Sequence, residues 1–251
     1  MLSKSEKLWI KSLKNKQTRY LQNEFIAEGS RIVLDLIRAA PQKLKFLCAT
    51  EEWYANFGPL LTNHTKKIRI ISNQILQSVS SLKSTEEVLA IFSFPDSPAT
   101  IKSDNRLIIY LEHIKDPGNL GTIIRSADWF GLQRIYCSPD SVDPFNNKCV
   151  QATMSSIMRV QVSAMTWEEM LEKYDTVDKY AAAADGESIY KLHQDDIQFI
   201  CIGNEAHGLS PQIVKQCKMK VSIPSYNSLG AESLNASVAC SLIMAWKTFG
   251  A

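Results

Sequence analysis

The stretch of sequence that decides the fold runs from Phe199 to Trp246. It opens as F-I-C-I-G-N-E-A-H-G-L-S-P (199–211) and closes as K-V-S-I-P-S-Y-N-S-L-G-A-E-S-L-N-A-S-V-A-C-S-L-I-M-A-W (220–246). Two short apolar runs, Phe199–Ile202 and Met219–Ile223, each end in a loop rich in Gly, Asn, Ser and Glu. Continuous apolar runs of this kind predict strands buried on both faces of a sheet. Because ligands of open α/β sheets bind at the carboxyl ends of strands, the two loops are candidates for a binding site.

A helical pattern follows the second of these loops. After Asn235 the apolar residues Val238, Leu242 and Trp246 recur every four positions, which predicts an amphipathic helix. Ser233 and Asn235 stand where that helix should begin, and both residue types are common N-caps. The free N–H groups at a helix N-terminus favour a polar or anionic ligand group. The residues alone therefore predict a strand–loop–helix pocket of unspecified chemistry.

Three segments carry a resemblance to a known family. G-N-E-A-H-G-L-S (203–210) and I-P…E-S-L-N-A-S-V-A (223–239) resemble the second and third motifs of the TrmH-type RNA methyltransferases of the SPOUT superfamily. D-P-G-N-L-G-T-I-I-R-S-A-D-W-F-G (116–131) resembles the first motif, and the three occur in the family's order. The resemblance implies an α/β fold, namely a SPOUT-type doubly wound domain whose C-terminal segment forms a trefoil knot. It also implies a homodimer, and S-adenosylmethionine as the methyl donor.

The resemblance assigns the site residue by residue. It implies a catalytic set of Asn119, Arg125, Glu205, Ser233 and Asn235, and cofactor contacts from Gly203, Ile223 and Leu234. By resemblance, Arg125 helps to activate a ribose 2′-hydroxyl and Asn119 helps to build the site. A guanidinium is permanently charged at neutral pH, so Arg125 suits stabilisation of the forming alkoxide better than proton abstraction.

The position of Arg125 on its helix is a separate expectation. We expect the helix of the first motif to begin near Gly121, which places Arg125 one turn in. Its side chain would then lean back toward Asn119 in the preceding loop. The structural alternative is that Arg125 pairs with a surface acid, for instance Asp128.

The second and third motifs also leave alternatives open. Glu205 is either a loop carboxylate that caps a helix or an active-site group, and in the latter case it holds Arg125 or accepts another hydrogen bond. The N-cap role of Ser233 and Asn235 is compatible with lining a pocket. Two features depart from the family pattern. The interval from Pro224 to Glu232 is two residues longer than usual, with the insert within residues 225–230, and Ser155 stands where Gly is usual.

The chain of 251 residues is long enough for two domains, and its 45% hydrophobic and 22% charged residues are ordinary for a soluble protein. We expect an N-terminal domain over residues 1–98 and a methyltransferase domain over 99–251, with a linker at P-D-S-P-A-T (95–100). The first domain resembles, more loosely, the RNA-binding domain of many TrmH-type enzymes, chiefly through F-x-x-E-G at Phe25–Gly29. Expected helices cover 31–39, 73–79, 122–130, 147–156 and 167–174, and expected strands cover 43–49, 68–71, 88–94, 106–111, 135–138, 157–162 and 180–184.

A net charge of +2 does not by itself indicate a nucleic-acid partner, but the positive charge is concentrated at the N-terminus. Lys4, Lys7, Lys11 and Lys14 are spaced so that a helix would align them on one face. We interpret this segment as a basic arm that neutralises RNA phosphates. The alternative is an ordinary solvated helix face.

Other classes of site find no support in the sequence. His64, His113, His193 and His207 are dispersed, so no metal site is expected. Neither a G-x-S-x-G hydrolase motif nor a dinucleotide-binding glycine fingerprint is present. The six cysteines form no C-x-x-C pair and are expected to be reduced thiols, and no segment is apolar enough for a signal peptide or a membrane span. We expect a cytoplasmic protein.

The sequence thus predicts a metal-independent enzyme that methylates a ribose 2′-oxygen of RNA with S-adenosylmethionine. Ribosomal RNA is the favoured substrate and transfer RNA the alternative. The rival from another class is a non-catalytic RNA-binding protein that retains the fold.

Overall fold

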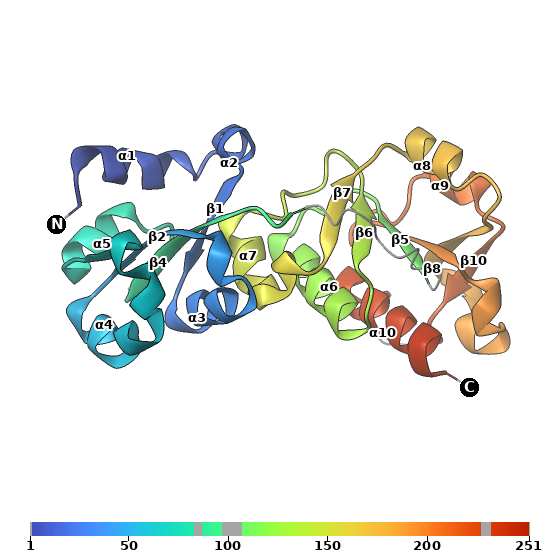
Figure 1. Ribbon diagram of the computed structural model, residues 1–251. Coiled ribbons are helices and arrows are strands. Elements are labelled where there is room, and N and C mark those ends of the chain that lie inside the picture. The colour runs from blue at the N-terminus through green and yellow to red at the C-terminus, as the bar shows by residue number, and fades with distance from the viewer. Residues whose placement is uncertain (1, 83–86, 97–106, 227–231, 251) are drawn as a thin grey trace. The chain divides into compact units, whose positions relative to one another are not determined.

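The computed structural model describes residues 2–82, 87–96, 107–226 and 232–250, which form two compact units (Figure 1). Unit 1 comprises Met1–Asp96 and Asp143–Met158, and unit 2 comprises Ser97–Val142 and Arg159–Ala251. The division differs from the predicted boundary in one respect. The segment Asp143–Met158, expected in the second domain, packs with the first. Most of the predicted linker, from residue 97 onward, lies outside the described residues.

Unit 1 contains a mixed sheet of four strands. The strands are β1 (Glu24–Glu28), β2 (Leu44–Ala49), β3 (Ile68–Ile70) and β4 (Val88–Ser93), in the order β1-β4-β2-β3. β4 runs antiparallel to both of its neighbours, and β2 and β3 are parallel. The strands expected at 43–49, 68–71 and 88–94 are therefore confirmed, with small changes at their ends.

Helices cover both faces of this sheet. Helices α1 (Lys4–Ser12) and α5 (Asn73–Val79) pack on the face that carries Phe46 and Ile91, while α3 (Ser30–Ala39) and α4 (Glu51–Phe57) lie on the opposite side (Figure 1). α1 begins at Ser3, whose hydroxyl accepts from the Glu6 amide while the Glu6 carboxylate accepts from the Ser3 amide. Ile10 in α1 and Leu13 just after it are fully buried in this core. The N-terminal segment is therefore an integral helix of unit 1.

The segment Asp143–Met158 completes unit 1. It contains α7 (Asn147–Thr153) and a 3-10 helix, Met154–Met158. The strand expected over 157–162 is wrong at its start, because β7 begins only at Gln161. A positive φ of 53° falls on Met154, so the backbone position that favours glycine is one residue before Ser155.

Two buried polar contacts fasten this segment to the rest of unit 1. Arg19, in α2 (Lys16–Gln22), forms a buried ion pair with Asp143. The buried carboxylate of Glu28 accepts a hydrogen bond from Asn147 Nδ2 at 2.7 Å. Both contacts join residues more than 100 positions apart in the sequence.

Unit 2 contains a sheet of six parallel strands. They are β5 (Ile108–Leu111), β6 (Arg134–Cys137), β7 (Gln161–Ala164), β8 (Lys179–Ser188), β9 (Phe199–Ile202) and β10 (Met219–Ser222), in the order β10-β8-β9-β5-β6-β7. After β5 the chain adds β6 and then β7 on one side of β5. It then crosses to the other side of β5, where β9 is the adjacent strand, β8 lies beyond β9, and β10 is the outermost strand. The loops after β5 and β9 therefore lie side by side at a topological switch point, where open α/β sheets bind ligands.

Helices cover both faces of the second sheet, as expected for a doubly wound α/β unit (Figure 1). Helices α8 (Trp167–Lys173) and α9 (Pro211–Gln216) pack on one face, where Trp167, Met170 and Ile213 meet Tyr110 and Phe199. Helices α6 (Pro117–Trp129) and α10 (Ala236–Phe249) lie together and are joined by a 2.7 Å hydrogen bond between Ser126 and Ser241. The remaining 3-10 helices of the described chain are Pro41–Lys43, Gly58–Lys67, Ile189–Lys191 and Gln194–Asp196. No helix in the described ranges is both long and apolar enough to cross a membrane.

Candidate active site

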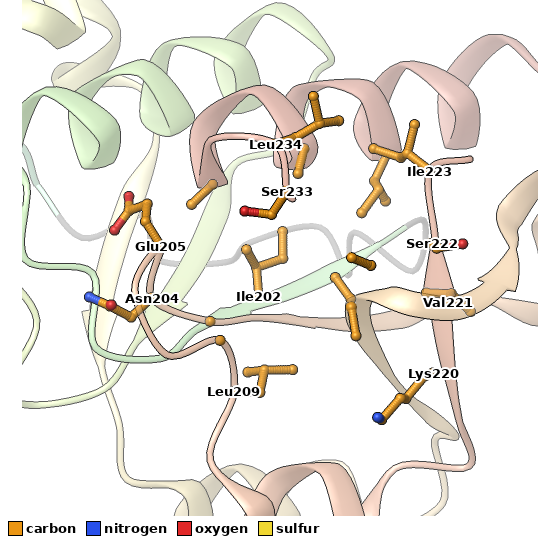
Figure 2. A pocket seen from close by; sticks show the side chains of 18 of the residues that line it. Ile202, Asn204, Glu205, Leu209, Lys220, Val221, Ser222, Ile223, Ser233 and Leu234 are labelled. Atoms are coloured by element: carbon orange, nitrogen blue, oxygen red, sulfur yellow. The ribbon is translucent and has the colours of Figure 1, made fainter. Parts of the chain in front are cut away.

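A cavity of about 650 Å³ opens in unit 2 beside the ends of β9 and β10. Its wall comes from the β9 loop, from β10 and the residues after it, and from the start of α10. Figure 2 shows Asn204 and Glu205 on one side, Ile223 and Lys220 on the other, and Ser233 directed into the space between them. Five of the eight predicted catalytic and cofactor-binding residues line this cavity, namely Gly203, Glu205, Ile223, Ser233 and Leu234.

The wall formed by β8 depends on an interruption of the strand ladder. Ala181 pairs with Lys220, but the next residue of β10, Val221, pairs with Glu187, so residues 182–186 leave the ladder. Ala182, Ala183 and Ala184 line the cavity, and their small side chains leave its volume open. Gly186 closes the bulge where a Cβ would lie 2.6 Å from the Val221 backbone, so only glycine fits there.

The loop after β9 is folded tightly on itself. Asn204 and Gly208 exchange backbone hydrogen bonds of 3.2 and 2.8 Å, and Gly208 has a φ of +68°. The Asn204 side chain accepts from the Ala206 amide at 2.8 Å. A Cβ on Gly203 would lie closer than 3.0 Å to the backbone of Gly208 and Leu209. The G-N-E-A-H-G sequence thus supplies the two glycines that the turn requires, and the turn presents Glu205.

Three predicted catalytic residues, from three separate segments, are joined by hydrogen bonds. Asn119 Nδ2 donates to Glu205 Oε1, and Asn235 Nδ2 donates to Asn119 Oδ1 at 3.0 Å. Asn235 Oδ1 in turn caps α10 by accepting from the amides of Ser237 (2.9 Å) and Val238 (3.4 Å). The N-cap prediction for Asn235 is confirmed. The structure places Glu205 as the acceptor of a hydrogen bond from the Asn119 side-chain amide.

Helix α6 begins earlier than expected. Asp116 is its N-cap, accepting from the Asn119 amide at 2.8 Å, and Pro117 occupies the first position. The expected start near Gly121 was therefore wrong, and Asn119 lies in the first turn of the helix rather than in a loop. Arg125 consequently lies more than two turns from the start of α6.

Arg125 is exposed, and within the described residues its guanidinium makes no hydrogen bond or ion pair. Among the residues that the structure describes, the alternative pairing with Asp128 is not observed. Asp128 instead accepts from Arg159 Nε at 3.0 Å and Nη2 at 2.6 Å. On α6, Arg125 lies four residues before Trp129, whose side chain is 83% exposed. The two side chains therefore share one exposed side of the helix.

The sequence matches two known protein-family models. The model of the SpoU rRNA Methylase family matches residues 106–245, which is more than half of the chain. The chain belongs to the SpoU rRNA methylase family. The model of the MRM3-like substrate binding domain matches residues 8–90, within unit 1. The SpoU match includes all eight predicted catalytic and cofactor-binding residues.

Individual members of the family resemble the chain over nearly its whole length. The 23S rRNA (guanosine(2553)-2'-O)-methyltransferase RlmP of Bacillus subtilis is 24% identical over 93% of this chain and 92% of its own. The 23S rRNA (uridine(2479)-2'-O)-methyltransferase of Streptomyces viridochromogenes is 27% identical over 94% and 86%, respectively. Among solved structures, the SpoU methyltransferase AviRb of Streptomyces viridochromogenes in complex with AdoMet superposes with a TM-score of 0.81. That structure covers 98% of this chain and 97% of its own, at 20% identity, and shows a common fold.

Sequence reasoning missed two parts of the SpoU-type site. Asn204 was not singled out, although it organises the Glu205 loop, and its signal was its place beside Glu205 in the second motif. The alanines of the β8 bulge were interpreted only as a strand, and the run of small residues before D-G was the available signal. Of the insert within residues 225–230, residues 227–230 lie outside the described residues.

The predicted RNA-binding lysines lie in unit 1 and differ from one another. Lys4, Lys7 and Lys11 belong to α1, but the helix ends at Ser12, so Lys14 does not share their face. Lys14 Nζ donates to the carbonyl oxygen of Ser80 at 2.8 Å. The predicted alignment of four lysines on one helix is therefore wrong for Lys14.

Over the described ranges, no group of three or more His, Cys, Asp or Glu side chains is placed to hold a metal ion. The six cysteines are free thiols, all buried except Cys217, which is half-buried.

Proposed function

We propose that this protein transfers a methyl group from S-adenosylmethionine to a ribose 2′-oxygen of ribosomal RNA. The observation that carries the proposal is the junction of Asn119, Glu205 and Asn235 at the edge of a 650 Å³ cavity, in a chain of the SpoU rRNA methylase family. Both relatives described above are named as 23S rRNA 2'-O-methyltransferases. Ribosomal RNA is accordingly the favoured substrate, and transfer RNA is the alternative.

The cavity has the character that a cofactor of this kind requires. Its volume falls in the usual range for small-molecule sites, and its wall combines apolar side chains with a few polar groups. At Gly203 the backbone of Gly208 and Leu209 occupies the position that a Cβ would take, so glycine lets the two segments of the cavity wall pack closely. Gly203, Ile223 and Leu234 would hold S-adenosylmethionine, largely through backbone and apolar contacts. The bound cofactor supplies an activated methyl group, so the protein's part is alignment and charge stabilisation.

Arg125 is the residue to which we assign stabilisation of the forming alkoxide. Its charge is permanent, and a fixed cation near the ribose oxygen favours loss of the hydroxyl proton during attack. Asn119, Glu205, Ser233 and Asn235 form the rest of the catalytic set. Asn119 and Asn235 hold the Glu205 carboxylate in place, and Ser233 faces the cavity.

A homodimer is part of the same proposal. The paired helices α6 and α10 expose large apolar side chains, namely Trp129, Val238, Leu242 and Phe249. Val238, Leu242 and Phe249 follow one side of α10 with spacings of four and seven residues. An exposed surface with two aromatic side chains is typical of an interface rather than of free solvent. A second copy of the chain would cover this surface and bring its Arg125 to the site of the first.

We infer that unit 2 carries the trefoil knot of SPOUT-type enzymes in its C-terminal segment, and that unit 1 binds RNA. The MRM3-like match over residues 8–90 supports the role of unit 1. We place the protein in the cytoplasm as part of the same proposal.

The direct test is methylation of large-subunit ribosomal RNA from cells that lack the protein. With labelled S-adenosylmethionine and a metal chelator, we expect label at a single ribose, mapped by resistance of the 2′-O-methylated position to alkaline hydrolysis. Label in transfer RNA instead would select the alternative substrate. Cofactor and RNA binding without label in either RNA would identify a non-catalytic RNA-binding protein and overturn the proposal.

Replacing Gly203 with alanine should weaken cofactor binding. A Cβ there collides with the backbone of Gly208 and Leu209, so the loop must shift and the cavity wall shifts with it. Overpacking of this kind costs about 1–3 kcal/mol of folding stability, and the displaced wall should bind the cofactor less tightly. Calorimetric titration with S-adenosylmethionine measures the loss. Gly131→Ala is the control: the Gly131 backbone, with φ +78°, also disfavours alanine, but for a different reason, since a Cβ there meets nothing within 4 Å and the residue is outside the cavity. Equal cofactor affinity in the Gly203→Ala protein would contradict the cavity assignment.

Replacing Lys4, Lys7 and Lys11 with glutamine should weaken RNA binding and reduce its dependence on salt. Removal of one lysine–phosphate interaction lowers the slope of log affinity against log salt by roughly 0.7–0.9. Fluorescence anisotropy across a salt series measures the slope. Lys14→Gln is the control, because its ammonium group is already bonded to the Ser80 carbonyl. An unchanged slope in the triple variant would show that these three lysines do not contact RNA phosphates and that they form an ordinary solvated helix face.

A further inference from the structure

The residues that follow β5 accept hydrogen bonds from both ends of the loop that carries Glu205. Asn204 Nδ2 donates to the carbonyl oxygen of His113 at 3.0 Å, at the start of the loop. The Ser210 amide donates to Glu112 Oε2 at 2.6 Å, at its end. Two adjacent residues, Glu112 and His113, therefore hold both ends of the Glu205 loop.

His113 has a backbone conformation that non-glycine residues rarely adopt. Its φ is +55°, in the left-handed region. Such conformations persist only where surrounding contacts impose them, and they are concentrated at functional sites. The left-handed turn falls just after β5, where the chain leaves the sheet toward Asp116, the N-cap of α6.

The side chain and amide of His113 supply those contacts. Its Nδ1 is hydrogen-bonded to Asp140 Oδ2, and its amide donates to Ser138 Oγ at 2.9 Å. Asp140 also accepts from Lys115 Nζ at 2.6 Å and from Ser138 Oγ at 2.8 Å. Burial opposes ionisation of Asp140, but the hydrogen bonds from Lys115, His113 and Ser138 outweigh it and hold the pKa of that carboxyl well below its ordinary value. Asp140 is therefore a fixed anionic acceptor for the His113 ring.

We propose that His113 is a positioning residue of the methyl-transfer site. Anchored on Ser138 and Asp140, its left-handed backbone directs a carbonyl to Asn204 and so fixes the loop that sets Glu205 against Asn119. His113 itself does not touch the reacting groups. The inference rests on the proposed function for its kinetic consequence, whereas the fixing of the loop stands on the geometry alone.

The substitutions separate the backbone and side-chain contributions of His113. His113→Ala removes the ring and penalises the left-handed backbone. His113→Asn keeps a donor near the position of Nδ1 and favours that backbone, which Asn23 of this chain adopts with a φ of 54°. Lys115→Ala is the matched control, because Lys115 bonds the same Asp140 but forms no hydrogen bond or ion pair with the Glu205 loop among the described residues.

Two measurements on the full-length protein test the proposal. Amide hydrogen exchange at Ala206 and Gly208 reports the loop directly, and single-turnover methylation of the ribosomal RNA described above, at saturating S-adenosylmethionine, reports its consequence. In His113→Ala we expect exchange about fivefold faster or more, and a methylation rate lower by on the order of ten- to a hundredfold. His113→Asn should recover most of both effects, and Lys115→Ala should show neither.

The outcomes that overturn the proposal are distinct from failure of the proposed function. Unchanged exchange at Ala206 and Gly208 in His113→Ala would show that His113 does not fix the loop. Equal effects in Lys115→Ala would assign the role to the charge on Asp140, and lack of recovery in His113→Asn would make the role merely structural. If the wild-type protein methylates no RNA, the proposed function fails, while the exchange rates still decide whether His113 holds the loop.

Discussion

Replacing Arg19 with alanine is expected to remove about 3–5 kcal/mol from the free energy of unfolding of unit 1, because the substitution leaves a buried carboxylate without its cation. The side chains of Arg19 and Asp143 are only 7% and 5% exposed. Arg19 donates to Asp143 Oδ2 from Nε at 3.0 Å and from Nη2 at 2.5 Å. Its Nη1 donates to the carbonyl oxygens of Leu13 and Lys14 at 2.8 and 2.9 Å. A loss of this size is a large share of the stability of an ordinary domain.

The same carboxylate organises its neighbours, which raises the expected effect. Asp143 Oδ1 accepts from Tyr20 Oη at 3.0 Å and from the Phe145 amide at 3.1 Å. The pair thus connects α2 to the chain as it enters the segment Asp143–Met158. Urea unfolding gives the free energy, and hydrogen exchange resolved by peptide shows whether the lost protection falls in unit 1.

Two further variants test whether the loss in the free energy of unfolding comes from breaking an ion pair as such or from leaving a buried charge unpaired. Lys218→Ala breaks an exposed ion pair with Asp178, and the free energy of unfolding should be essentially unchanged. The double variant Arg19→Met with Asp143→Leu removes both charges, so it should lose less stability than Arg19→Ala alone. If Arg19→Ala unfolds like the wild type, the buried pair does not hold unit 1 together.

This ion pair also shows where sequence reasoning reached its limit. The spacing of Lys4, Lys7, Lys11 and Lys14 indicated a basic helix face near the N-terminus. Nothing local showed that Arg19 meets Asp143, which is 124 positions away. The placement of residues 143–158 in unit 1 depends on such distant contacts, and these contacts override the strand expected from Ile157 onward.

The candidate site was predicted more completely than the fold around it. Motif resemblance identified Gly203, Glu205, Ile223, Ser233 and Leu234, and the structure places all five around one cavity. The hydrogen bonds among Asn119, Glu205 and Asn235 could not be predicted, because they depend on β5 and β9 being neighbours in the sheet. Local patterns predict strands but not their order.

The error at the start of α6 has a local cause. Gly118 and Gly121 disfavour a helix over this stretch, since glycine weakens a helix interior. The stronger signal was Asp116 followed by Pro117, an N-cap and a first-turn residue that together begin a helix. Correcting the start matters for function, because Asn119 and Arg125 then belong to one helix, and Arg125 lies on its exposed side beside Trp129 rather than one turn from the helix start.

Arg125→Ala is expected to lower the single-turnover rate of methylation by roughly a hundred- to a thousandfold, or about 2.7–4 kcal/mol, as for loss of one preorganised electrostatic donor. The affinity for S-adenosylmethionine should be nearly unchanged, because Arg125 does not line the cavity. Arg125→Lys should recover little, since an ammonium cannot reproduce the planar set of guanidinium donors. The melting temperature should stay close to that of the wild type, because the exposed Arg125 makes no ion pair within the described residues.

Mixed dimers then show in which subunit Arg125 acts. Neither Arg125→Ala nor Glu205→Ala alone should be active, and the two inactive proteins can be unfolded, mixed and refolded together. If Arg125 reaches the site of the partner subunit, each mixed dimer has one site that combines an intact Glu205 with an intact Arg125, and activity returns. If Arg125 acts within its own subunit, both sites of the mixed dimer lack one residue and the mixture stays inactive. A fully active but less stable Arg125→Ala protein would contradict the catalytic assignment altogether, because Arg125 would then serve the fold rather than the reaction.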